Sequence, residues 1–167
     1  STINLCEQLA KKYPANNFVP VYWMASEDHD FAEINHFHLF GKSIEWNPEN
    51  KVATAVGKLS TDSLKTIFDE VKVLFGSSEN AQEMTTIFEN SYLNNATLTD
   101  ATRFLVHQLF GKYNLVILDA DDKRLKQEFL PVISDDIFKR ENFESITNSI
   151  HQLEKLGYKA QVNPREI

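Results

Sequence analysis

The sequence is poor in cysteine and has no long apolar run. Its single cysteine, Cys6, cannot form an internal disulfide, and a lone thiol fits a reducing compartment. No apolar stretch approaches the roughly 20 residues that a membrane-spanning helix needs. No basic stretch followed by an apolar core marks a secretion signal. We therefore expect a cytoplasmic protein that does not cross a membrane.

The sequence also has fewer basic than acidic residues. The 167 residues include 17 Lys and Arg against 24 Asp and Glu, a net charge of −7. A nucleic-acid surface needs clustered Lys and Arg to meet phosphates, so we expect no nucleic-acid partner. With 42% apolar and 25% charged residues, the composition is that of a folded globular chain.

Glycine is scarce as well, with five residues in the chain. The sequence contains no GxGxxG, GxxxxGK[ST] or GxSxG pattern, so it supplies no glycine-rich cradle for phosphates and no nucleophile elbow.

Apolar runs alternate with helical patterns along the chain. The runs at residues 18–25 (FVPVYWMA) and 115–118 (LVIL) predict strands buried on both faces of a parallel sheet, with regular pairing only after Pro20. Alternating apolar residues at 36–46 predict a strand or a hairpin that turns near Gly41 and Lys42. Helices are expected at 3–13, in three stripes within 60–111, from 123 onwards and at 143–156, and a short strand at 159–162.

This order predicts an α/β fold with a partial Rossmann-like parallel sheet. We divide the chain into a first part of the core at 1–56, a helical insertion at 57–112 and a second part of the core at 113–167. Gly76, Gly111 and Gly157 each follow a helical stripe, where a left-handed glycine commonly ends a helix.

Acidic residues and a histidine follow the first predicted strand. If Ser26 caps a helix, His29 and Glu33 share one face of it, four residues apart. A carboxylate beside a histidine suits acid–base catalysis, and paired carboxylates can instead hold Mg²⁺. The plainer alternative is that these acids only stabilise the start of a helix.

A second acidic cluster follows the other predicted strand. It comprises Asp119, Asp121 and Asp122, of which Asp122 can cap the next helix. Because ligands bind beyond the carboxyl ends of parallel strands, the two clusters could face one crevice.

Two further functions remain open from the residues alone. His29, His36 and His38 with nearby carboxylates could form the zinc site of a metal-dependent hydrolase. The chain could also be a non-catalytic globular domain.

Three segments carry a resemblance to a known family. Residues 19–35 (VPVYWMASEDHDFAEIN), 115–122 (LVILDADD) and 157–166 (GYKAQVNPRE) resemble, in order, segments of the cysteine-adding enzymes of bacillithiol synthesis, the BshC family. The resemblance implies a ligase that joins L-cysteine to glucosaminyl malate through an amide, on a Rossmann-like core with inserted connecting segments. The family is longer than this chain, so we expect an internal fragment of that core.

The resemblance also implies cofactors, partners and residue roles. Activation of a carboxylate implies ATP and Mg²⁺ in the parent enzyme, which is expected to dimerise through a C-terminal coiled coil absent here. The catalytic residues expected are His29, Asp28 and Asp30. The substrate-binding residues expected are Glu27, Glu33, Asn35, Asp119, Asn163 and Arg165.

Overall fold

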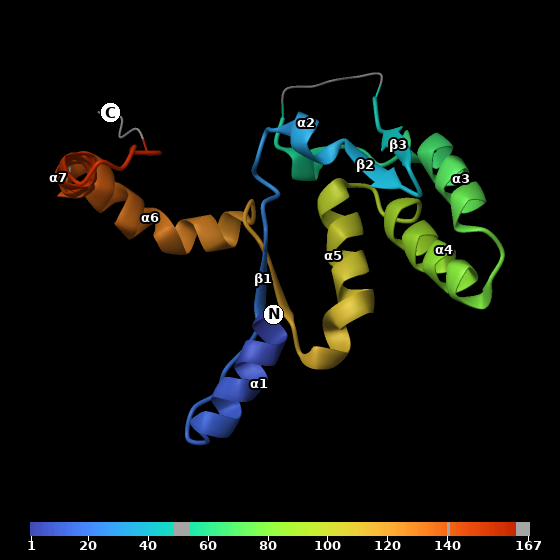
Figure 1. Ribbon diagram of the computed structural model, residues 1–167, viewed down its shortest axis with the longest axis horizontal. Helices are drawn as coiled ribbons and strands as arrows, with labels where there is room; N and C mark the ends of the chain where they lie inside the picture. Colours follow the sequence, from blue (N-terminus) through green and yellow to red (C-terminus); the bar gives the residue numbers. More distant parts are fainter. Residues whose placement is uncertain (49–53, 140, 163–167) are drawn as a thin grey trace. The chain divides into compact units, whose positions relative to one another are not determined.

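The computed structural model describes residues 1–48, 54–139 and 141–162. The chain forms two compact units, Ser1–Asp121 and Asp122–Ile167, which Figure 1 shows coloured along the sequence. The division of the chain at residues 56 and 112 stays a prediction.

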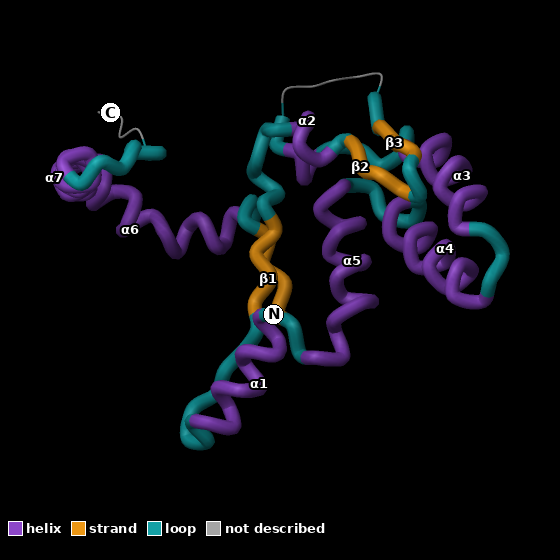
Figure 2. Tube along the Cα trace, viewed as in Figure 1, coloured by secondary structure: helices purple, strands orange, loops and turns teal. Residues whose placement is uncertain are grey.

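Two strands far apart in sequence form a parallel pair in the first unit. Strand β1 (Val21–Met24) lies beside β4 (Val116–Asp119), with Val21 opposite Val116 and Met24 opposite Asp119. Figure 2 shows the two strands side by side. Pro20 lies just before β1, and its carbonyl accepts a hydrogen bond from the amide of Val116 at 3.0 Å. The predicted α/β fold with a parallel sheet is confirmed.

Burial of this pair differs from the prediction. Met24 is buried, but Val21 is exposed and 58% of Trp23 is accessible. Within the described residues the sheet has only these two strands. Most β1 side chains therefore lack the flanking strands and helices that bury a parallel strand on both faces.

The hairpin turns where the sequence predicts. Strand β2 (His36–Leu39) pairs antiparallel with β3 (Lys42–Glu45). Phe40 and Gly41 link them with φ values of 48° and 78°, as a two-residue turn with two left-handed positions requires. The hairpin buries Ile44, and the indole of Trp46 donates to Ser63 Oγ at 2.9 Å. That bond ties the hairpin to the start of the helical block.

The predicted helical block is confirmed. A 3-10 turn, η1 (Val56–Lys58), precedes helices α3 (Leu64–Phe75), α4 (Glu79–Tyr92) and α5 (Leu98–Phe110). Helix α4 packs against α3 and α5, and α5 also packs on β4 (Figure 1). Gly76 ends α3 with φ of 79°. Thr97 caps α5 by accepting a hydrogen bond from the amide of Asp100 at 3.2 Å.

Gly111 is the C-cap of α5 as predicted, but it does not have the expected left-handed conformation. Its φ is −56°, and it opens the 3-10 turn η2 (Gly111–Tyr113); the left-handed residue is Asn114, with φ of 57°. A Cβ at position 111 would lie 2.8 Å from Cε1 of the His107 ring. Close packing of that ring, rather than backbone conformation, explains the glycine.

The other helices fit their predicted positions. Helix α1 (Thr2–Lys12) begins the chain and has no buried residue. In the second unit, α6 (Lys123–Lys139) is followed by α7 (Glu141–Lys155), after which Gly157 has φ of 83°. The strand predicted at 159–162 is wrong, because the described part of the chain gives these residues no pairing partner. No helix in the described ranges is long and apolar enough to span a membrane.

Candidate functional site

The carboxyl ends of β1 and β4 meet through Ser26. Ser26 is 5% exposed, and its hydroxyl donates to Oδ1 of Asp119. The same hydroxyl accepts from the amide of Asp121 at 3.2 Å. Ser26 therefore joins the two strand ends, and the prediction that it caps a helix is wrong.

The turn η1 closes over this junction. The amide of Gly57 donates to the carbonyl of Ser26 at 2.9 Å, and the amide of Val56 donates to that of Asp28 at 2.7 Å. A Cβ on Gly57 would lie 2.7 Å from the Ser26 carbonyl oxygen and 2.3 Å from Thr99 Oγ1. Only glycine allows the backbone to approach the strand end this closely.

Two cations that the sequence did not indicate complete the junction. Arg103 on α5 lies with its Nη2 3.4 Å from Oδ2 of Asp119, and Lys58 Nζ lies 2.7 Å from Oδ2 of Asp121. Neither belongs to a recognisable motif. The only signal that could have found them is the need of partly buried carboxylates for a counter-charge.

The segment from Glu27 to Asp30 forms a turn instead of the predicted helix. Asp28 Oδ1 accepts from the amides of His29 at 2.6 Å and Asp30 at 3.2 Å, which is how an aspartate side chain stabilises a tight turn. Helix α2 (Phe31–Ile34) begins only after Asp30. His29 and Glu33 therefore do not share a helix face, and that prediction is wrong.

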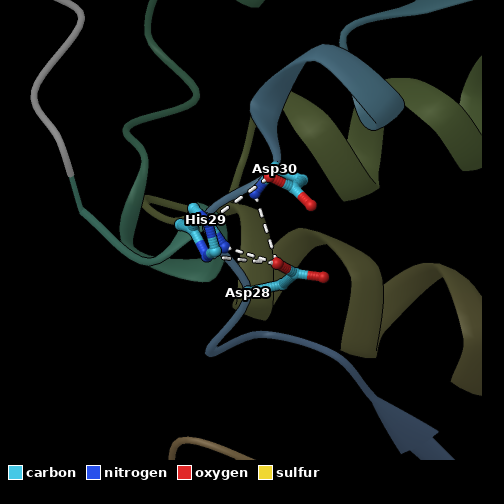
Figure 3. A group of neighbouring side chains, drawn as sticks. All are labelled: Asp28, His29 and Asp30. Atoms are coloured by element: carbon cyan, nitrogen blue, oxygen red, sulfur yellow. Dashed lines mark hydrogen bonds and ion pairs between the residues drawn. The ribbon is translucent and has the colours of Figure 1, made fainter. Parts of the chain in front are cut away.

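His29 lies between two carboxylates in this turn. Its Nδ1 is 3.6 Å from Asp28 and its Nε2 is 3.5 Å from Asp30, as Figure 3 shows. The imidazole is 86% exposed, so a substrate can reach it. An accessible imidazole beside carboxylates is an arrangement that can transfer protons.

The same three residues form a group of possible cation ligands within the described residues. Their ligand atoms lie within 4.8 Å of one another. His36 and His38 lie instead on β2, with ring centroids 6.2 Å apart. The structure, over its described ranges, does not unite them with His29 in one group of metal ligands, so it offers no support for the zinc-hydrolase alternative.

The other predicted site residues are scattered. Glu27 and Glu33 are exposed. Asn35 is half-buried, and its side-chain oxygen lies 3.0 Å from Nδ1 of His36. Asn163 and Arg165 lie outside the described residues. The structure brings Asp119 together with Ser26, and it keeps Asp28, His29 and Asp30 as a separate group.

One cavity adjoins the carboxyl end of β1, and another lies along α5 and the first part of β4. The larger, about 540 Å³, is walled mostly by apolar side chains and reaches Ser26, Gly57 and Tyr92. Burial, and secondarily the neighbouring Tyr22, raises the pKa of Tyr92. The smaller, about 430 Å³, lies between α5 and β4 and includes Arg103 and His107.

Comparison with known proteins identifies the family. Residues 1–167 match the family described as the N-terminal Rossmann-like domain of the bacillithiol biosynthesis protein BshC. The chain belongs to the BshC family. This membership confirms the Rossmann-like assignment and the resemblance of the three sequence segments.

Curated BshC relatives align over the whole chain. A protein of Flavobacterium psychrophilum, named as a cysteine ligase, is 51% identical over 167 residues. A Christiangramia forsetii protein of the same name is 48% identical over 169 residues, and one from Flavobacterium johnsoniae is 48% identical over 167. The chain spans 31% of the length of each of these relatives.

Proposed function

We propose that this chain supplies part of the active site of a ligase that adds L-cysteine to glucosaminyl malate, forming an amide in bacillithiol biosynthesis. The observation that carries the proposal is the junction of Ser26 and Asp119 at the carboxyl ends of two parallel strands, in a chain of the BshC family. Ligands of α/β sheets bind at this edge.

We propose His29 as the residue that accepts a proton in this reaction. The ammonium group of cysteine must lose a proton before the amine can attack a carbonyl carbon. His29 is exposed and flanked by Asp28 and Asp30, so its imidazole is accessible to accept this proton. Asp28 also fixes the turn through its two backbone hydrogen bonds.

Substrate binding is assigned to polar groups around the strand ends. We propose Asp119 and Asn35 as residues that contact the substrates, because Asp119 lies at the end of β4 and Asn35 lines the larger cavity. Glu27 and Glu33 are exposed near the His29 turn and are proposed for substrate hydroxyl or amino groups. Asn163 and Arg165, outside the described residues, keep the same proposed role.

Nucleotide phosphates do not fit the described residues. The amide of Gly57 is engaged by the carbonyl of Ser26, and Lys58 faces the carboxylate of Asp121. No glycine-rich loop offers free backbone amides in the described ranges, as a phosphate cradle requires. We therefore propose ATP and Mg²⁺ as cofactors of the intact gene product, with no reaction step assigned to them here.

The remaining features of the proposal concern the intact gene product. We propose that it works in the cytoplasm on these small-molecule substrates and binds no nucleic acid. We also propose that it forms a homodimer through a coiled coil outside this chain.

The test is turnover by the intact gene product that carries this sequence. Product formation is measured with L-cysteine, glucosaminyl malate and ATP–Mg²⁺. His29→Ala is expected to lower kcat by about 100-fold or more, as loss of a general base does. His151→Ala, an exposed histidine on α7, is the matched control and should leave kcat unchanged. Absence of product from the native protein would refute the ligase assignment; an unchanged kcat in His29→Ala would refute only the role of His29.

A further inference from the structure

Arg103 is held by a single contact. Its Nη2 lies 3.4 Å from Oδ2 of Asp119, and this is its only hydrogen bond or ion pair to the residues that the structure describes. A guanidinium has five N–H donors, so most of them are not engaged by the protein. The side chain is 44% exposed, which leaves these donors accessible to a ligand.

Arg103 lines the smaller cavity, which combines polar and apolar walls. Asn95 and His107 supply polar groups, and Phe104, Leu115 and Ile117 supply the apolar surface. The His107 ring is packed closely against Gly111, so its position is restrained. The cavity, about 430 Å³, is large enough for a small organic acid.

The wall of this cavity also includes one acidic side chain, Asp100. Its Oδ2 accepts a hydrogen bond from Thr97 Oγ1 at 2.7 Å, within the cap of α5. Arg103 is the one Lys or Arg side chain that the described residues contribute to the wall, and its single contact is with Asp119. Its remaining N–H donors match the two oxygens of a carboxylate.

We infer that Arg103 binds a carboxylate of a ligase substrate in the cavity between α5 and β4. The planar guanidinium can donate two parallel hydrogen bonds to a carboxylate, a geometry that lysine cannot reproduce. Ser26 acts as a positioning residue, because it fixes Asp119 through Oδ1 while Oδ2 of Asp119 restrains the guanidinium. The inference rests on the proposed function for the identity of the acid, since L-cysteine and the malate moiety both carry carboxylates.

Direct titration of the intact gene product tests this inference and distinguishes the two sources of the carboxylate. Disodium L-malate and L-cysteine are titrated separately by calorimetry, at an ionic strength held constant with chloride. We expect one of them to bind, and Arg103→Gln to raise its Kd about tenfold or more, the loss expected for hydrogen bonds to a charged group. Arg103→Lys should restore only part of the affinity.

Kinetics give the second readout. In Arg103→Gln the KM for the corresponding substrate should rise about tenfold, with a smaller change in kcat, as loss of ground-state binding predicts. Arg124→Gln is the matched control, because Arg124 is an exposed arginine that also pairs with an aspartate, Asp122. Its binding and KM should match those of the native protein.

The outcomes separate this inference from the ligase assignment. If native protein and Arg103→Gln bind both acids equally, or if the native protein binds neither, the inference is overturned. Full affinity in Arg103→Lys would overturn the bidentate geometry. If malate or cysteine binding depends on Arg103 but no amide product forms, the carboxylate site stands and the proposed ligase function fails.

Discussion

The hydroxyl of Ser26 bonds to the carboxylate of Asp119, a residue 93 positions later in the chain. The bond closes the carboxyl edge of the β1–β4 pair and is partly buried, with Ser26 itself buried. Around it gather Gly57, Asp121 and Arg103. The stability of this edge and the orientation of Asp119 therefore depend on one hydroxyl.

Ser26→Ala should destabilise the fold by about 1–3 kcal/mol, because a partly buried carboxylate loses a hydrogen-bond donor. The free energy of unfolding is measured by urea denaturation. Ser43→Ala, an exposed serine on β3, should change it little. A double-mutant cycle with Asp119→Ala should show that the two changes are not additive; simple additivity would mean that the contact contributes nothing.

Gly57→Ala should lower the free energy of unfolding by about 1–3 kcal/mol, the usual effect of overpacking. The added Cβ would meet Thr99 and Ser26 at less than 3 Å. Gly41, with φ of 78° and open space around it, provides the contrast. Asparagine tolerates the left-handed region, so Gly41→Asn should be nearly neutral in urea denaturation whereas Gly57→Asn should not. An unchanged free energy of unfolding in Gly57→Asn would show that the turn η1 does not pack closely against the strand end.

Ile44→Ala should lower the free energy of unfolding by about 2–5 kcal/mol, because the substitution leaves a cavity in the core. Ile44 is 2% exposed and lies on β3, and it lines the larger cavity together with Ile67 and Phe68 of α3. Val73→Ala, at an exposed position on α3, should change stability by less than about 0.5 kcal/mol. Equal thermal midpoints for the two variants would contradict this placement of the core.

Tyr92 should make stability fall at alkaline pH. Burial raises its pKa above the ordinary value of 10.0, with a smaller contribution from Tyr22. The folded state then keeps a proton that the unfolded state releases, so the stabilisation is complete below about pH 10 and is lost as pH rises through the raised pKa.

The measurement is urea denaturation at several pH values from about 8 to 11, the range that spans tyrosine ionisation. Tyr92→Phe should lose less stability over this range than the native chain. Tyr158→Phe, which removes an exposed tyrosine, should follow the native curve. Parallel curves for the native chain and Tyr92→Phe would disprove the expected pH dependence.

The sequence by itself determined the elements that depend on local patterns. Apolar spacing of three and four residues predicted the helices, and the apolar runs at 18–25 and 115–118 predicted the two strands. Gly41 predicted the hairpin turn because few other residues adopt its backbone conformation. The sequence also predicted the family, through the resemblance of the segment at 19–35.

Tertiary structure decided which side chains meet. The pairing of β1 with β4 brings Ser26 to Asp119, and the packing of α5 on β4 brings Arg103 to the same carboxylate. Local patterns misplaced His29 on a helix, because the side chain of Asp28 competes for the backbone amides. Local patterns also predicted a left-handed Gly111, whereas the glycine is needed because the ring of His107 leaves no room for a Cβ. Such contacts join residues distant in sequence, or side chain to backbone, and no periodic pattern records them.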